Sequence, residues 1–147
     1  MFGRIVNFLF GDLLRGQKFY YLSLIKEDDG SFSIHGLWPQ FNKTSYPTFC
    51  KKVDFSIDKL ESIIEELNKY WYSTMEKNDD FWKHEYMKHG SCVFTKMNEL
   101  QYFSKTLELY KEAVKLGLPE KYEKNEKNRD HIRCLIPVSL DFKFMED

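Results

Sequence analysis

The segment from Phe81 to Gly90, FWKHEYMKHG, contains two histidines, a glutamate and two lysines. Side chains of these types bind metal ions, transfer protons or form ion pairs on a helix surface. A zinc-binding H-E-x-x-H helix places its two histidines four residues apart, on one face. Here His84 and His89 are five residues apart, about 140° around a helix, and the cationic Lys88 lies between them. The spacing therefore argues against a metal site.

The same segment brings other pairs of side chains together. Glu85 lies three residues before Lys88 and four before His89, and His84 lies four before Lys88, so one helix presents an imidazole, a carboxylate and an ammonium group. This set suits phosphodiester cleavage, in which an imidazole transfers a proton and fixed charges stabilise the developing phosphorane. A solvated helix with internal ion pairs explains this segment equally well.

A second candidate segment is SIHGLWP, residues 33–39. His35 ends a predicted strand and points away from its apolar face, Gly36 permits a sharp turn, and the proline after Trp38 restricts the indole. An imidazole beside an exposed indole is typical of a nucleotide pocket, because base stacking contributes about 1–3 kcal/mol. The alternative is a core tryptophan with an incidental histidine. His131 belongs to neither segment and is predicted to lie on the surface.

Hydrophobic patterns predict the strands that position these segments. Residues 18–26 form a nearly continuous apolar run, which predicts a central strand covered on both faces. The EDDG turn and the alternating residues 31–35 predict that this strand continues into a hairpin. Residues 131–144 alternate again around Pro137, which predicts two short strands or an edge strand.

Helical periodicity predicts three helices between the strands. They cover residues 54–71 with Ser56 or Asp58 as cap, residues 81–90 with Asp79 or Asp80 as cap, and residues 98–116. Residues 120–130 are charged without apolar periodicity and are predicted to form a solvated loop. The order of strands, helices and strands predicts an α+β fold, with an antiparallel central sheet packed with helices.

Composition limits the classes of protein that remain. The 147 residues are 42% hydrophobic and 17% aromatic, which predicts one globular domain over residues 1–147. A net charge of -1 favours an enzyme that visits RNA briefly over a stable RNA binder. No apolar run approaches the roughly 18 residues of a membrane span. Residues 1–17, in which Asp12 interrupts a short apolar run, are interpreted as a degenerate or poorly ordered leader.

HGLWP followed by FWKHEYMKHGSC resembles the two active-site segments of the ribonuclease T2 family of acid endoribonucleases. The family pattern is H-G-L-W-P and then H-E-W-x-K-H-G-T-C. This chain departs from it at Tyr86 and Ser91, both conservative replacements. The resemblance extends from Lys18 to Asp147.

The resemblance implies a site and a reaction. His35 and His89 would be the acid–base pair, His84 would help to hold the phosphate, Glu85 and Lys88 would stabilise the transition state, and Trp38 would stack on a base. The charges beside His89 favour it as the first base, but the sequence leaves open which histidine is base and which is acid. The ribose 2′-OH would attack phosphorus to give a 2′,3′-cyclic phosphate and then a 3′-phosphate. The implied enzyme acts on single-stranded RNA as a monomer, with no metal, cofactor or membrane partner.

The resemblance also assigns the cysteines. It implies a disulfide between Cys50 and Cys92 and leaves Cys134 as a buried or free thiol. Family members are usually secreted or vacuolar, but the sequence shows no clear leader, so the compartment stays open.

Two other classes of function remain open. A catalytically silent RNA-binding or immune-modulating relative would bind RNA without forming a cyclic phosphate. A metallohydrolase would lose activity to a chelator and coordinate an ion near His84.

Overall fold

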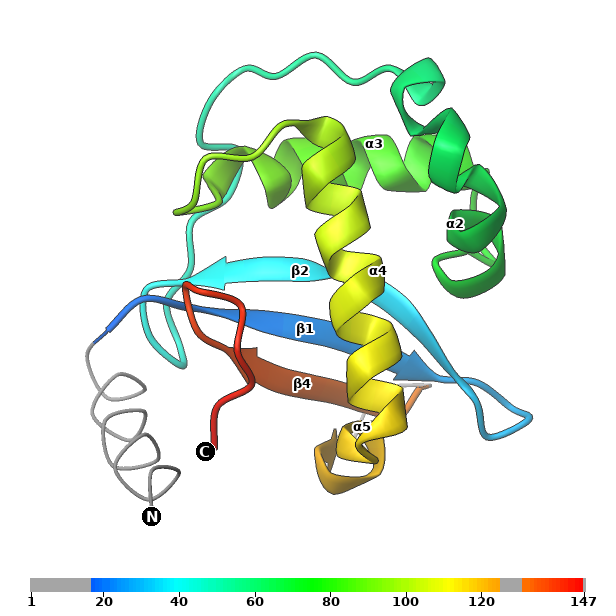
Figure 1. Ribbon diagram of the computed structural model, residues 1–147, viewed down its shortest axis with the longest axis vertical. Coiled ribbons are helices and arrows are strands. Elements are labelled where there is room, and N and C mark those ends of the chain that lie inside the picture. Colours follow the sequence, from blue (N-terminus) through cyan, green and yellow to red (C-terminus); the bar gives the residue numbers. More distant parts are fainter. Residues whose placement is uncertain (1–16, 125–130, 147) are drawn as a thin grey trace.

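The computed structural model describes residues 17–124 and 131–146 (Figure 1). Apart from Gln17, the predicted leader lies outside the described residues, as does part of the predicted charged loop. Within the described ranges, no helix has both the length and the apolar character needed to cross a membrane.

A four-stranded antiparallel sheet forms one layer of the fold. Its strands are β1 (Phe19–Lys26), β2 (Phe32–Gln40), β3 (Glu123–Lys124) and β4 (Arg133–Val138), in the order β2-β1-β4-β3. The apolar run of β1 is central and buried along most of its length, as the sequence predicts. Together with the helices, this sheet confirms the α+β fold.

Helices form the second layer. They are η1 (Ile57–Ile63) and η2 (Gly90–Cys92), which are 3₁₀ helices, and the α-helices α2 (Ile64–Tyr70), α3 (Asn78–Lys88), α4 (Glu99–Lys115) and α5 (Leu118–Lys121). Figure 1 shows α4 crossing the sheet and α3 running beyond its β2 side. The phenolic O–H groups of Tyr102 and Tyr110 in α4 donate to the carbonyl oxygens of Leu37 and Phe32 in β2. These buried bonds fix α4 against the strand that carries half of the candidate site.

The helix predictions were correct in position but wrong in detail. The predicted helix 54–71 is divided into η1 and α2. Helix α3 begins at Asn78, three residues before the predicted start, and its N-cap is Lys77, without a side-chain bond. Asp79 and Asp80 lie in its first turn and not at the cap. Their negative charge there interacts favourably with the helix dipole. Helix α4 begins after the capping box of Asn98 and Gln101, within one residue of its predicted start.

Two strand predictions also need correction. β2 does not turn at Gly36 but continues to Gln40. β4 is one strand that runs through Pro137, not two. Pro137 has no amide N–H to donate, but it lies beyond the short pairing with β3. Its carbonyl oxygen accepts the Met145 N–H. The predicted loop 120–130 begins with the end of α5 and with β3.

Candidate active site

Helix α3 carries the second candidate segment and is anchored in the core. Its buried residues are Phe81, Trp82, Glu85 and Tyr86. The indole N–H of Trp82 donates to the buried carbonyl oxygen of Trp71 at 2.6 Å, which fixes the rotation of the helix. Glu85 therefore faces inward while His84 is exposed. A buried glutamate contradicts the alternative of a simple solvated helix.

A β-bulge positions the first candidate segment. Gly36 pairs with Ser23, but the next residue of β1 pairs with Ile34, so His35 is an extra residue in β2. Regular alternation would place His35 and Trp38, three residues apart, on opposite faces of the sheet. The bulge brings them together, with ring centroids 5.0 Å apart.

The carboxyl group of Glu85 is the centre of the site. His35 Nε2 lies 3.7 Å from Glu85 Oε2, and His89 Nε2 lies 4.0 Å from Oε1. The Trp38 indole N–H donates to Oε1 at 3.1 Å. Two imidazoles from different elements thus face one buried carboxyl group, which an indole holds in place.

Gly36 allows this close approach of α3 to β2. A Cβ atom at position 36 would overlap Glu85 Oε1 and would lie 2.7 Å from Trp38 Nε1. Because neither atom could move without breaking the Trp38–Glu85 bond, any side chain here displaces the carboxyl group. The glycine in H-G-L-W-P is therefore needed for packing against α3, not for a turn.

Burial sets the protonation states of Glu85 and His89. It raises the pKa of Glu85 from 4.5 to about 7, against the opposing effects of the Trp38 bond and the Lys88 charge. Burial, together with the positive charge of Lys88, lowers the pKa of His89 from 6.5 to about 3. At mildly acidic pH the buried pair is an uncharged imidazole beside a protonated carboxyl group.

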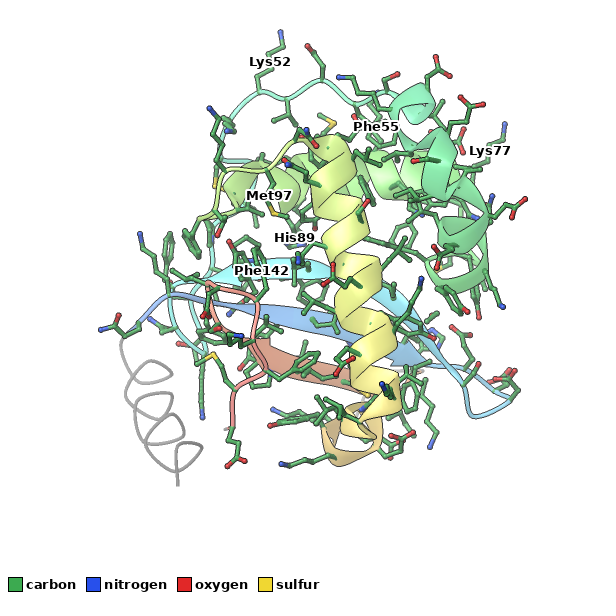
Figure 2. All side chains as sticks on the ribbon, viewed as in Figure 1. Lys52, Phe55, Lys77, His89, Met97 and Phe142 are labelled. Carbon is green, nitrogen blue, oxygen red and sulfur yellow. A yellow bond between two sulfur atoms is a disulfide. The ribbon has the colours of Figure 1, made fainter. Side chains whose placement is uncertain are left out.

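The remaining predicted residues of α3 line the same cavity. His84 and Lys88 border a cavity of about 570 Å³ together with His35, Glu85 and His89. Figure 2 shows His89 in the interior, between α3 and β2. The structure thus brings all five predicted catalytic residues together. His131 is exposed, as the sequence predicts.

Trp38 directly contacts two of the predicted catalytic residues, Glu85 and His89. Its ring stacks on His89, with centroids 5.1 Å apart and an interplanar angle of 25°. The Arg133 guanidinium carbon lies 5.3 Å from the Trp38 ring centroid. Base stacking by Trp38 stays a prediction. In the structure, its indole stacks on His89 and donates a hydrogen bond to Glu85.

Arg133 is one of three charged residues of this cavity that the sequence interpretation missed; the other two are Lys43 and Glu76. It begins β4, next to Cys134 and Ile136, which are buried in the core on the opposite face of the strand. An arginine in an interior strand of a sheet is unusual and is the signal that could have identified it.

The predicted disulfide joins Cys50 and Cys92, whose Cα atoms are 5.1 Å apart. The Cys50 N–H donates to Ser91 Oγ at 3.0 Å, and the Phe49 N–H donates to the Lys88 carbonyl oxygen at 2.9 Å. These links tie the segment after β2 to the end of α3. The disulfide prediction is confirmed.

Cys134 is a buried free thiol, also as predicted. Its S–H donates to the Pro119 carbonyl oxygen, and burial raises its pKa to about 12. In the part of the chain that is described, no three or more His, Cys, Asp or Glu side chains are grouped to hold a metal ion.

Comparison with known proteins finds matches over the part of the chain that contains both candidate segments. The model of the ribonuclease T2 family matches residues 17–123. Ribonuclease DdI of Dictyostelium discoideum is 39% identical over 84 residues, which cover 56% of this chain and 38% of that protein. Ribonuclease MC of Momordica charantia is 30% identical over 115 residues, which cover 78% of this chain and 60% of that protein. The matches thus span less than two thirds of these relatives.

Solved structures share the fold. The crystal structure of RNase NT in complex with 5′-AMP matches with a TM-score of 0.69 and 21% identity, covering 88% of this chain and 90% of that one. A likeness at this identity establishes the architecture alone.

Proposed function

The chain belongs to the ribonuclease T2 family, and from that premise we propose that it is a metal-independent endoribonuclease acting on single-stranded RNA. The ribose 2′-OH attacks the adjacent phosphorus and the 5′-oxygen leaves, which gives a 2′,3′-cyclic phosphate. Water then opens the cyclic phosphate to a 3′-phosphate.

The observation that carries this proposal is the placement of two imidazoles against one buried carboxyl group. His35 Nε2 and His89 Nε2 lie 3.7 and 4.0 Å from the two oxygens of Glu85. Transesterification needs one group that accepts the 2′-OH proton and a second that donates a proton to the leaving oxygen. Two histidines that line one pocket from different elements, β2 and the end of α3, meet this need.

The lowered pKa of His89 supports its role as the first base. A buried imidazole with a pKa of about 3 is neutral at mildly acidic pH, so it has a lone pair for the 2′-OH proton. His35, which is more exposed, then donates its proton to the 5′-oxygen. In the hydrolysis step the roles exchange: His35 takes a proton from water and His89 returns its proton to the 2′-oxygen.

Residues of α3 stabilise the charge that develops around phosphorus. Lys88 and His84 line the cavity and supply positive charge to the non-bridging oxygens. Glu85 faces both imidazoles and donates a hydrogen bond when it is protonated. RNase NT, which shares the fold, forms a complex with 5′-AMP, and this supports a nucleotide as the occupant of the cavity.

The proposal is tested by cleavage of single-stranded RNA in EDTA by variants of the two histidines. We expect His35→Ala and His89→Ala each to lower kcat/KM by roughly 10²–10⁴-fold. His131→Ala is the matched control, because that histidine is exposed and outside the cavity. Undiminished cleavage by both site variants, or loss of cleavage on adding EDTA, contradicts the proposal. Tight RNA binding by the wild type without turnover would instead support a silent relative.

A further inference from the structure

Arg133 enters the cavity from the sheet, not from α3. Strand β4 alternates, with Cys134, Ile136 and Val138 in the core beneath the helices. Arg133 and Leu135 therefore lie on the opposite face, where both line the cavity that contains the two catalytic histidines. The strand fixes the backbone of Arg133 by pairing it with Ile25 on one side and Lys124 on the other.

The guanidinium group borders the catalytic centre across an aromatic ring. Its carbon lies 5.3 Å from the centroid of Trp38, and the same indole donates its N–H to Glu85. The backbones of His35 in β2 and Arg133 in β4 are two strand spacings apart, or about 10 Å, and their side chains meet the Trp38 ring at 5.0 and 5.3 Å from its centroid. Lys88 and His84 approach from α3 instead. Lys43, in the loop after β2, also lines the cavity, so positive charge reaches it from α3, from this loop and from β4.

Arginine is suited to phosphate at such a place. Its charge is permanent, its N–H groups match two phosphate oxygens at once, and packing over an aromatic ring restricts its side chain before a ligand arrives. An RNA strand that holds one phosphate between His35 and His89 carries further phosphates one nucleotide away on either side. The separation across Trp38 places Arg133 toward such a neighbour.

We propose that Arg133 forms a binding subsite for the phosphate that flanks the scissile phosphate of RNA. The inference rests on the proposed function, because it takes the cavity to be an RNA site. Arg133 acts there as a binding residue and transfers no proton.

Binding of nucleotides with one or two phosphates tests the subsite without requiring turnover. The ligands are uridine 3′-monophosphate and uridine 3′,5′-bisphosphate, measured by calorimetry. We expect the wild type to bind the bisphosphate more tightly, and Arg133→Met to reduce this preference by at least tenfold. Arg133→Lys should restore part of it, and the dependence of log Kd on log salt should fall by about one unit in Arg133→Met.

Lys115→Met is the matched control, since it removes one positive charge from the exposed end of α4. Thermal unfolding of each variant shows that the fold is retained. Equal weakening of both ligands by Arg133→Met, or no change in either, overturns the subsite. A preference for the bisphosphate that Arg133→Met removes, found without any cleavage of RNA, would contradict the proposed function and leave the subsite supported.

Discussion

Single residues determine how pH acts on the proposed reaction. Glu85 and His89 are buried together, and burial moves both toward their neutral forms. The helix C-terminus and a Glu85 carboxylate would favour the charged form of His89. Desolvation outweighs both, because the imidazole is almost fully buried and its Nε2 is 4.0 Å from the carboxyl oxygen, beyond hydrogen-bond distance.

The pH profile of activity tests this balance. His89 with a pKa of about 3 stays neutral in mild acid, so the acid limb of kcat/KM should lie well below pH 6.5. Lys88→Met removes a charge that lowers this pKa, and we expect the acid limb to shift upward. Lys83→Met is the control, since it changes an exposed lysine of the same helix. An acid limb that stays in place or moves downward in Lys88→Met contradicts the assignment of His89 as base.

At the scale of elements, the site depends on how closely α3 approaches β2. The bulge at His35 and the absence of a side chain at Gly36 allow Glu85 to reach both imidazoles. Gly36→Ala should lower kcat/KM by roughly 10²-fold, because displacement of a catalytic group by about 1 Å costs that much. Steady-state kinetics together with thermal unfolding separate lost geometry from lost fold.

Gly30→Asn is the control for this change, since Gly30 lies in the exposed turn between β1 and β2 and has a φ of 88° that asparagine tolerates. Full activity in Gly36→Ala would show that Glu85 is not held where the structure places it.

The sequence was informative wherever local pattern decides structure. The apolar run of β1, the amphipathic α4 and the residues of the two motifs could all be predicted, because periodicity and side-chain type are local. The bulge at His35 could not, since it is the pairing with β1 that shows it. Arg133 was missed for a similar reason: only the β2-β1-β4 order places it beside Trp38.

At the scale of the whole molecule, the site should reduce stability. The pKa of Glu85 rises from 4.5 to about 7 on folding, so the folded state binds the proton more tightly than the unfolded state. Stability from this group is complete below pH 4.5 and is lost as pH rises through 7. His89 acts in the opposite direction, losing stability as pH falls from 6.5 toward 3.

Replacing Glu85 separates these two effects. The free energy of unfolding of Glu85→Gln, minus that of the wild type, should rise by about 3 kcal/mol from pH 4 to pH 8, because glutamine does not ionise. Urea denaturation at pH 4, 6 and 8 measures the difference, with the exposed Glu65→Gln as control. A difference that is constant with pH would show that Glu85 is not neutral in the folded protein.

The central claim is that this chain cleaves RNA without a metal, by attack of the ribose 2′-hydroxyl group on the adjacent phosphorus. The most direct measurement is analysis of the products from a dinucleoside monophosphate in EDTA, beside the same substrate with a 2′-deoxyribose at the cleaved position. We expect a 2′,3′-cyclic phosphate that converts to a 3′-phosphate, and no cleavage of the deoxy substrate. A 5′-phosphate product, or cleavage of the deoxy substrate at a similar rate, would contradict it.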